Sequence, residues 1–328
     1  MAQTHKLDPA QGQTLANQMG RLNASLGPGD VIHLAAGFHG APVITRANEA
    51  VVSVLGEPGA IVGKTVLAGA KKWLFQSISF RGVDPAADEK SVNRLVDVSP
   101  TSADIIFQSC SFATVDDISG WSPDDWVLKP FNVALMMRGS GCALLNSRIF
   151  NVRNALSLSG PGGRAIDNVI EHFGNDAIQF GADGLVISRN VIRQGRHTAR
   201  EQLHADGMQG YPKANDGVHT GILIENNTVD MTGAAGDYLQ GITAFDGRWR
   251  DVRVLRNKVV VNAWHGITWF GVDGIEIAGN TVALSPNSNP KLTPWISVDK
   301  SKEGRPSSNI RVHDNVCRTY RLPPGTPH

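Results

Sequence analysis

The chain has 328 residues, of which 41% are hydrophobic and 19% are charged, and its net charge is +1. This apolar fraction is too high for a disordered chain, and the balanced charge gives no general attraction to nucleic acid or to a membrane surface. No apolar run approaches the roughly 18 residues that a membrane-spanning helix needs. We therefore expect a globular protein without nucleic-acid or membrane partners.

The N-terminal segment predicts a helix over residues 7–27. Asp8 followed by Pro9 is typical of a helix start, and Gly27-Pro28-Gly29 ends the pattern. Four apolar residues between them recur at helical spacing: Leu15, Met19, Leu22 and Leu26. We expect this helix to cap the open end of a stack of strands that begins with Val31–Leu34. The segment 1–30 lacks the pattern of a secretory signal.

The rest of the chain repeats a template in which two apolar residues, an Asn and a further apolar residue stand at fixed offsets. The template occurs at Leu185/Ile187/Asn190/Ile192, Ile222/Ile224/Asn227/Val229, Val252/Val254/Asn257/Val259 and Ile275/Ile277/Asn280/Val282. Looser copies have Asn168 and Asn315, or replace the Asn with Ile78, Cys110 or Arg148. The base period between anchors is about 22 residues, and some copies contain insertions.

A unit of this length, with short alternating segments and no helical period, predicts one coil of a parallel β-helix. Leucine-rich repeats share the Asn and the period, but they require leucines where this chain has β-branched residues. An Asn recurring at a bend can stack on its copies and satisfy buried turn amides. We therefore assign the Asn column a structural role.

These features together carry a resemblance to a known superfamily. An amphipathic helix, the segment Gly29-Asp30-Val31-Ile32-His33-Leu34-Ala35-Ala36-Gly37 and Asn-anchored coils resemble the right-handed parallel β-helix proteins. That superfamily includes pectate, alginate and chondroitin lyases, polygalacturonases and phage tailspikes. The resemblance implies an all-β, right-handed parallel β-helix of about ten coils with a short N-terminal capping helix. We expect a single domain over 1–328, with coils over 30–318 and a tail over 319–328.

In the middle and C-terminal part of the chain, each coil has a second short strand with the pattern polar, small, apolar, polar. It occurs at 154–157, 176–179, 206–209, 240–243 and 265–268. Strand alternation would place the last polar residue of each on the outside in one column: Ser157, Gln179, Gln209, Thr243 and Thr268. Such a column would form a polar strip for binding sugar.

Two insertions, 195–203 and 212–220, flank the strand that begins at Asp206 and predict a groove there. The segment His204-Ala205-Asp206-Gly207-Met208-Gln209-Gly210-Tyr211 is similar to groove strands of β-helix proteins that process polysaccharides. Arg and Lys pair with sugar carboxylates, and aromatic rings stack on sugar faces. The expected substrate-binding residues are Asp176, Gln179, Arg196, Arg200, Gln209, His219, Thr243, His265 and Trp269.

Three functions fit this groove. A lyase that cleaves a uronic-acid polysaccharide by β-elimination must neutralise a carboxylate, remove the adjacent proton and protonate the leaving oxygen. The residues expected to do so are His204, Asp206, Tyr211 and Lys213. A glycoside hydrolase would instead use the two carboxyls of Asp176 and Asp206. A tailspike-like β-helix would bind glycan without cleaving it. We expect a monomer, or a trimer if the protein is tailspike-like.

Cofactors and location follow less directly from the sequence. Ca²⁺ is a candidate cofactor, with oxygen ligands available from Asp176, Asp183, Asp206, Asp216 and Asp273, but their spacing matches no calcium loop. The separated Cys110, Cys142 and Cys317 are expected to be free thiols. A protein that acts on an anionic polysaccharide would be extracellular, periplasmic or virion-associated.

Overall fold

The computed structural model describes residues 2–82, 93–196, 204–212, 217–232 and 238–328. The chain forms two compact units, Met1–Arg164 and Ala165–His328. Both units consist of short parallel strands that recur in groups of three, one strand for each of three sheets. Consecutive groups are coils stacked on one another, as the repeat predicted.

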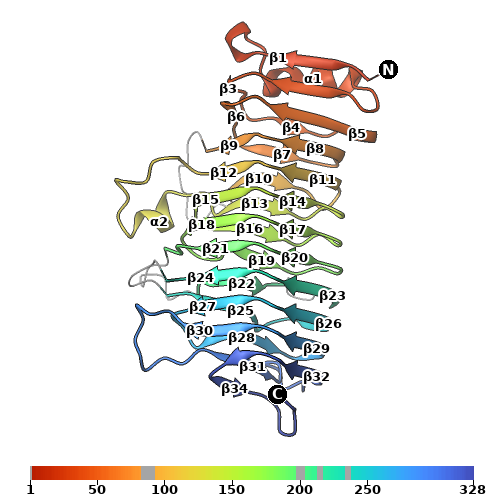
Figure 1. The fold of residues 1–328 in the computed structure, drawn as a ribbon. Coiled ribbons are helices and arrows are strands. Elements are labelled where there is room, and N and C mark those ends of the chain that lie inside the picture. Colours follow the sequence, from red (N-terminus) through yellow and green to blue (C-terminus); the bar gives the residue numbers. More distant parts are fainter. Residues whose placement is uncertain (1, 83–92, 197–203, 213–216, 233–237) are drawn as a thin grey trace. The chain divides into compact units, whose positions relative to one another are not determined.

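In the first unit, strands with the same place in successive coils pair in parallel (Figure 1). The first sheet contains β1 (Thr4–Leu7), β2 (Val31–Leu34), β5 (Ala47–Gly56), β8 (Lys71–Gln76), β11 (Ala103–Gln108) and β14 (Ala143–Leu145). The second contains β3 (Gly37–Phe38), β6 (Ala60–Val62), β9 (Ser79–Arg81), β12 (Ser111–Ala113) and β15 (Arg148–Val152). The third contains β4 (Val43–Ile44), β7 (Thr65–Leu67), β10 (Arg94–Val98), β13 (Val133–Met137) and β16 (Asn154–Leu158).

The second unit repeats this arrangement. Its first sheet contains β17 (Arg164–Ile166), β20 (Val186–Ser188), β23 (Val218–Glu225), β26 (Arg248–Leu255), β29 (Val272–Ala278) and β32 (Ser308–His313). The second contains β18 (Val169–Phe173), β21 (Val191–Arg193), β24 (Thr228–Asp230), β27 (Lys258–Val261), β30 (Thr281–Leu284) and β33 (Val316–Cys317). The third contains β19 (Ile178–Phe180), β22 (Asp206–Gly210), β25 (Gln240–Ala244), β28 (His265–Phe270), β31 (Trp295–Asp299) and β34 (Thr319–Arg321).

The predicted all-β, right-handed parallel β-helix is thereby confirmed, since crossovers between parallel strands are right-handed in nearly all proteins. The interior of each unit is filled by the apolar residues that alternate along the strands. In the first unit the rings of Phe75 and Phe107 stack with centroids 5.1 Å apart, and those of Phe80 and Phe112 stack at 4.9 Å. Each coil therefore buries its apolar side chains against the coils before and after it.

The N-terminal cap is shorter than the predicted 7–27. Residues Thr4–Leu7 form β1 and pair in parallel with β2, and Pro9–Gln11 form the 3₁₀ helix η1. Helix α1 (Leu15–Ser25) begins at Thr14, whose hydroxyl accepts from the backbone of Asn17 in a reciprocal capping box. Asp8 thus caps η1 instead of α1, as its carboxylate accepts from the amide of Ala10.

The predicted Asn column is confirmed, and it forms a continuous ladder in the second unit. The backbone and side-chain amides of each Asn both donate to Oδ1 of the Asn in the next coil, at 2.8–3.1 Å. The ladder runs from Asn168 through Asn190, Asn227, Asn257 and Asn280 to Asn315. It occupies the bend between the first and second sheets.

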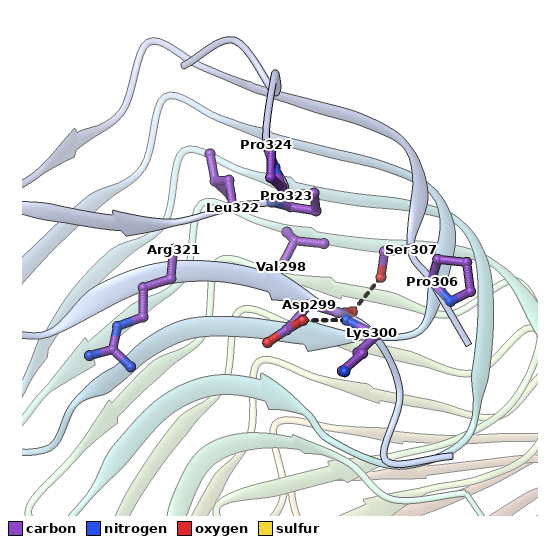
Figure 2. A pocket seen from close by; sticks show the side chains of 9 residues that line it. All are labelled: Val298, Asp299, Lys300, Pro306, Ser307, Arg321, Leu322, Pro323 and Pro324. Atoms are coloured by element: carbon purple, nitrogen blue, oxygen red, sulfur yellow. Dashed lines mark hydrogen bonds between the residues drawn. The ribbon is translucent and has the colours of Figure 1, made fainter. Parts of the chain in front are cut away.

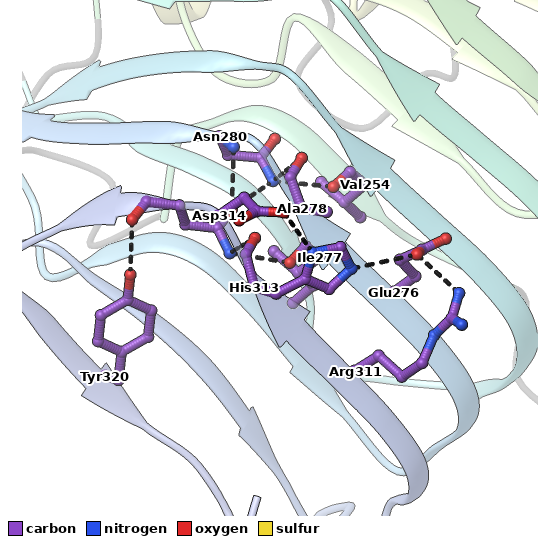
Figure 3. A network of polar contacts seen from close by, with 10 residues as sticks. Val254, Glu276, Ile277, Ala278, Asn280, Arg311, His313, Asp314 and Tyr320 are labelled. Carbon is purple, nitrogen blue, oxygen red and sulfur yellow. Dashed lines mark hydrogen bonds and ion pairs between the residues drawn. The ribbon is translucent and has the colours of Figure 1, made fainter. Parts of the chain in front are cut away.

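The second N–H of the same side chains reaches back to the preceding coil. Asn280 Nδ2 donates to the carbonyl oxygens of Val254 and Ala278 at 2.8 and 3.2 Å (Figure 3). Tyr320 holds the last bend, because its hydroxyl donates to the carbonyl oxygen of Asn315. The ladder therefore satisfies turn amides and carbonyls that burial would otherwise leave without partners.

The residue before each ladder position has the left-handed backbone conformation, a feature that the repeat template did not include. The φ angles before the six asparagines are 59° at Asp167, 56° at Arg189, 55° at Asn226, 54° at Arg256, 67° at Gly279 and 56° at Asp314. In the first unit Ser77, Ser109 and Asn146 have the same conformation. One left-handed residue thus turns the chain sharply enough to place the next side chain in the ladder.

One predicted anchor was wrong by a single residue. Ser147 lies in the ladder position, where its hydroxyl accepts from the amide of Cys110 at 3.0 Å, whereas the predicted Arg148 is exposed. Phe107 accordingly pairs with Leu144. The apolar run from Cys142 to Leu145 allowed both registers, and only the inward direction of Leu144 separates them.

The first unit also contains a loop with the short helix α2 (Asp125–Leu128) between its second and third sheets. Cys110 and Cys142 are buried free thiols and Cys317 is a half-buried one, as expected from their spacing. In the described part of the chain, no helix has the length and apolar character required to cross a membrane.

Candidate active site

The predicted polar column exists on the third sheet of the second unit. Gln179 pairs with Gln209, Gln209 with Thr243, and Thr243 with Thr268. Ser297 continues the column, whereas Ser157 lies in the first unit and pairs with Met136. The expectation of a strip facing solvent holds only in part, because Gln179 and Gln209 are half-buried and both threonines are fully buried.

The small residue of the pattern explains how two polar residues three apart share one face. A Cβ atom on Gly207 would lie 2.7 Å from Val229, and one on Gly241 would lie 2.6 Å from Val259. Both valines are buried, so the glycines face the interior together with the apolar residue that follows them. Because Gly207 and Met208 both face the interior, the residues before and after them, Asp206 and Gln209, lie on the same outer face.

Asp176 and Asp206 lie in adjacent coils and are joined by a hydrogen bond. The backbone amide of Asp206 donates to Asp176 Oδ1 at 3.0 Å. Asp176 Oδ2 accepts from the side chains of Gln179 at 2.8 Å and Asn175 at 3.2 Å. Both carboxyl groups are buried, with exposed fractions of 2% for Asp176 and 0% for Asp206.

Asp206 is held in an environment that disfavours its charge. Burial and, to a smaller extent, the neighbouring Asp176 raise the pKa of Asp206 well above its usual range, although a hydrogen bond from Thr243 opposes them. The Thr243 hydroxyl donates to Oδ1 at 2.7 Å, and no described residue forms a hydrogen bond with Oδ2. Asp206 therefore carries a proton at pH values at which an ordinary aspartate is ionised.

Gln240 connects the carboxyl pair to two further titratable side chains. It pairs with Asp206 in the strand register, and its Nε2 lies 3.4 Å from Nδ1 of His204 and 3.3 Å from the hydroxyl of Tyr238. Burial raises the pKa of Tyr238, and the charge of Asp206 contributes to the rise. Tyr238 was not predicted, because it follows an insertion and lies outside the repeated pattern.

His265 extends this cluster by one coil. Its Nδ1 lies 3.0 Å from the Thr268 hydroxyl, and its ring meets Phe245 and Trp295 edge to face at 4.9 and 5.0 Å. Burial lowers the pKa of His265 to about 4, and the charges of Arg321 and His204 act in the same direction. His265 is therefore neutral at physiological pH.

Two residues predicted to bind substrate are in the interior instead. Trp269 is fully buried against Trp249 and Phe180, with ring centroids 5.3 and 6.0 Å apart. His219 lies in β23 on the first sheet, where its ring packs against Trp249 at 5.3 Å. The sequence pattern gives the spacing of aromatic residues but does not indicate which of them face inward. The second insertion also ends earlier than predicted, since β23 begins at Val218.

The remaining predicted residues do not join the cluster. Tyr211 follows β22 and is 61% exposed, and no contact in the described part of the chain joins it to Asp206. Arg196 is half-buried, and its backbone amide donates to the carbonyl of Phe173. Arg200 and Lys213 lie outside the described residues, as do most residues of the two insertions.

The carboxylates do not assemble a calcium site in the described part of the chain. That part contains no group of three or more His, Cys, Asp or Glu residues close enough to hold a metal ion. Asp183 accepts from the amide of Thr220, and Asp273 accepts from the side chains of Ser308 and Asn309. Asp216 lies outside the described residues. The pair Asp176 and Asp206 alone supplies fewer oxygen ligands than Ca²⁺ requires.

Comparison by sequence identifies no relative, because no protein-family model and no curated protein sequence matches the chain. Comparison by structure identifies several similar proteins. The Dettilon tailspike protein superimposes with a TM-score of 0.63 at 13% identity, over 98% of this chain and 63% of the tailspike. A mannuronic-acid-specific family 6 polysaccharide lyase from the human gut microbiota gives a TM-score of 0.55 at 11% identity, over 98% of this chain and 78% of that chain.

The DFA-IIIase of Arthrobacter chlorophenolicus without its lid gives a TM-score of 0.56 at 13% identity, over 91% of this chain and 82% of that chain. The chain shares the right-handed parallel β-helix fold. Identities this low establish the fold of the β-helix and leave its reaction open, because one fold supports many activities. The chemistry of this β-helix has to be inferred from the cluster around Asp206.

Proposed function

We propose that the protein cleaves glycosidic bonds in a polysaccharide that lies along β19, β22, β25 and β28. The observation that carries this proposal is the buried pair of carboxyls, Asp176 and Asp206, at the centre of the polar column. Four coils stacked about 4.8 Å apart span roughly 15 Å, which accommodates about three sugar units.

In this proposal Asp206 is the general acid and Asp176 is its ionised partner. A carboxyl whose pKa is raised well above its usual range by burial can retain the proton that it gives to a leaving glycosidic oxygen. Asp176 accepts three hydrogen bonds, from Asp206, Gln179 and Asn175, and these favour its charged form. Adjacent coils place the two residues about 4.8 Å apart along the stack, comparable to the ~5 Å between the carboxyls of retaining glycosidases.

Both carboxyls are buried when no substrate is bound, so substrate must displace part of their surroundings. Gln179 and Gln240 are the neighbouring side chains whose amides can exchange their present partners for sugar hydroxyls. Hydrolysis then takes two steps: the Asp176 carboxylate attacks the anomeric carbon while Asp206 protonates the leaving oxygen, and a water molecule that gives its proton back to Asp206 then releases the sugar from Asp176.

Cleavage by β-elimination is the second candidate, favoured by the position of His204 and Tyr238 on either side of Gln240. An imidazole and a phenol can remove the proton beside a uronic-acid carboxyl and protonate the leaving oxygen. Protonated Asp206 would then hydrogen-bond to the substrate carboxylate. Either reaction requires a carbohydrate substrate, which would be met outside the cell or at a virion surface.

The two reactions differ in their products and in the variants that abolish them. The protein is incubated with uronic-acid and neutral polysaccharides, and reducing ends and ultraviolet-absorbing unsaturated ends are measured. Hydrolysis is supported if the products have reducing ends without ultraviolet absorbance and if Asp176→Asn and Asp206→Asn abolish their formation. Elimination is supported if the products absorb in the ultraviolet and if His204→Ala and Tyr238→Phe abolish that absorbance. Asp167→Asn, an exposed aspartate paired with Arg189, is the matched control and keeps full activity. Cleavage by all four site variants at the wild-type rate would refute this site.

A further inference from the structure

A stack of flat side chains lies on the third sheet near the C-terminal end of the second unit. The rings of Trp264 and Trp295 are parallel within 6°, with centroids 6.3 Å apart. The guanidinium of Arg321 lies 3.6 Å from the centroid of the Trp295 ring. Trp295 is buried, but Trp264 is 50% exposed and leaves an indole surface open to solvent.

This stack is continuous with the candidate active site. Trp264 directly precedes His265, whose Cα pairs with that of Trp295, and Arg321 pairs with Ser297 of the polar column. The His265 ring meets Trp295 edge to face, while His265 and the side chain of Gln240 lie in adjacent coils. A sugar chain that follows the column past Asp206 therefore reaches Trp264 and Arg321 next.

Arg321 is held in place without being neutralised. Stacking on Trp295 fixes its guanidinium, yet no described carboxylate lies within ion-pair distance and no described group accepts a hydrogen bond from it. Other arginines of this unit are paired, such as Arg311 with Glu276 at 2.6 Å and Arg193 with Glu171 at 2.8 Å. A positioned cation whose N–H groups have no acceptor is suited to binding an anion.

Arg321 also lines a pocket of about 330 Å³ (Figure 2). Val298, Leu322 and Pro323 supply its apolar lining, and Asp299, Lys300 and Ser307 supply its polar lining. Its size is at the lower end of the range for small-molecule sites. Trp295 thus connects the open indole of Trp264 to the guanidinium of Arg321, and the pocket adjoins Arg321.

We propose that Trp264, Trp295 and Arg321 form a subsite for an acidic sugar unit, one that carries a carboxylate or sulfate. This inference rests on the proposed function and names its substrate class. The apolar face of the sugar ring packs on Trp264, and the acidic group pairs with Arg321. An anionic polysaccharide is thereby favoured over a neutral one at the end of the strip that lies C-terminal to Asp206.

Binding and cleavage are measured separately to test this subsite. An array of uronic-acid, sulfated and neutral glycans is probed with Asp206→Asn protein, to which Trp264→Ala, Arg321→Gln or Arg321→Lys is added. Trp121→Ala and Arg311→Gln are the matched controls, because they remove a tryptophan of the first unit and an exposed arginine of the first sheet. Thermal unfolding establishes that each variant is folded.

We expect binding to acidic glycans to weaken about tenfold or more in Trp264→Ala and Arg321→Gln, and less in Arg321→Lys, which keeps the charge but loses the flat stack. The controls should bind as well as the parent protein. Binding only to neutral glycans, binding to none, or equal losses in the controls would overturn the subsite. If the variants lose binding to acidic glycans but the wild type cleaves no glycan, the proposed reaction is refuted and the subsite is supported. Cleavage that is insensitive to Trp264 and Arg321 would refute the subsite alone.

Discussion

Asn227 and Asn257 are joined through a single oxygen atom. The backbone amide and the side-chain amide of Asn227 each donate to Oδ1 of Asn257 at 2.9 Å, while the second side-chain N–H of Asn227 donates to the carbonyl of Ile187. Asn227 Oδ1 in turn accepts both amides of Asn190. A buried side chain that makes four hydrogen bonds has no isosteric apolar substitute.

Replacing Asn227 with Leu should therefore lower the free energy of unfolding by about 1–3 kcal/mol, because buried amides lose their partners. Chemical denaturation of the two proteins measures the difference. The exposed Asn287, replaced in the same way, should change it by less than about 0.5 kcal/mol. Equal stability of Asn227→Leu and wild type would show that the ladder contributes no net stability.

Substitutions of Ser77 test the importance of the left-handed backbone conformation that precedes each ladder position. It is exposed, has a φ of 58° and makes no side-chain hydrogen bond in the described part of the chain. Ser77→Val should destabilise by about 1 kcal/mol or more, since a β-branched residue is poorly tolerated in this conformation. Ser77→Gly should be nearly neutral, because relief of strain is offset by a more flexible unfolded chain. Thermal unfolding of both variants gives the comparison, and similar midpoints would contradict it.

Asp206 should make the protein less stable as the pH rises. Its folded-state pKa is raised, so between the usual value of 3.8 and the folded value the native state binds more protons than the unfolded state. Asp206→Asn should thus unfold at a higher temperature than wild type at pH 8, and the advantage should disappear below about pH 4. Calorimetry across this range measures it. An advantage that does not vary with pH would mean that Asp206 is not the titrating group.

His265 should make the protein less stable as the pH falls, opposite to the effect of Asp206. Its pKa falls from 6.5 to about 4 on folding, so the unfolded state binds the extra proton between these values and stability is lost as the pH falls through them. His265→Gln should remove this part of the acid sensitivity. His313 is the control of opposite sign, because its pKa is raised by Asp314 and Glu276, and its contribution is lost as the pH rises. Matching pH profiles for His265→Gln and wild type would refute the assignment.

The fold could be predicted because its main determinant is periodic. An Asn at a fixed offset from apolar pairs recurs in every coil of the second unit, and hydrogen bonds between coils require that recurrence. The predicted register was wrong at Arg148, where several consecutive apolar residues precede a bend whose ladder position holds Ser147 instead of Asn. Periodicity therefore fixes the register most firmly where an Asn occupies the ladder position.

The candidate site could be predicted only in outline. Asp176 and Asp206 share the repeated frame, so their position in adjacent coils followed from the pattern, but their burial and the raised pKa of Asp206 depend on what covers them. Trp269 and His219 were placed in the groove because sequence spacing does not distinguish inward from outward aromatic rings. Tyr238 was missed, because its contact with Gln240 follows an insertion and belongs to no repeat.

The ladder also has a consequence for how such a protein can diversify. The six asparagines are separated in sequence by 22, 37, 30, 23 and 35 residues, yet the bonds between them differ by only a few tenths of an ångström. The number of residues between two ladder asparagines therefore does not affect the lengths of the hydrogen bonds that join them. Natural variation can lengthen the loops beside Asp206, and with them reshape the candidate site, while the asparagine ladder that holds the coils in register stays the same.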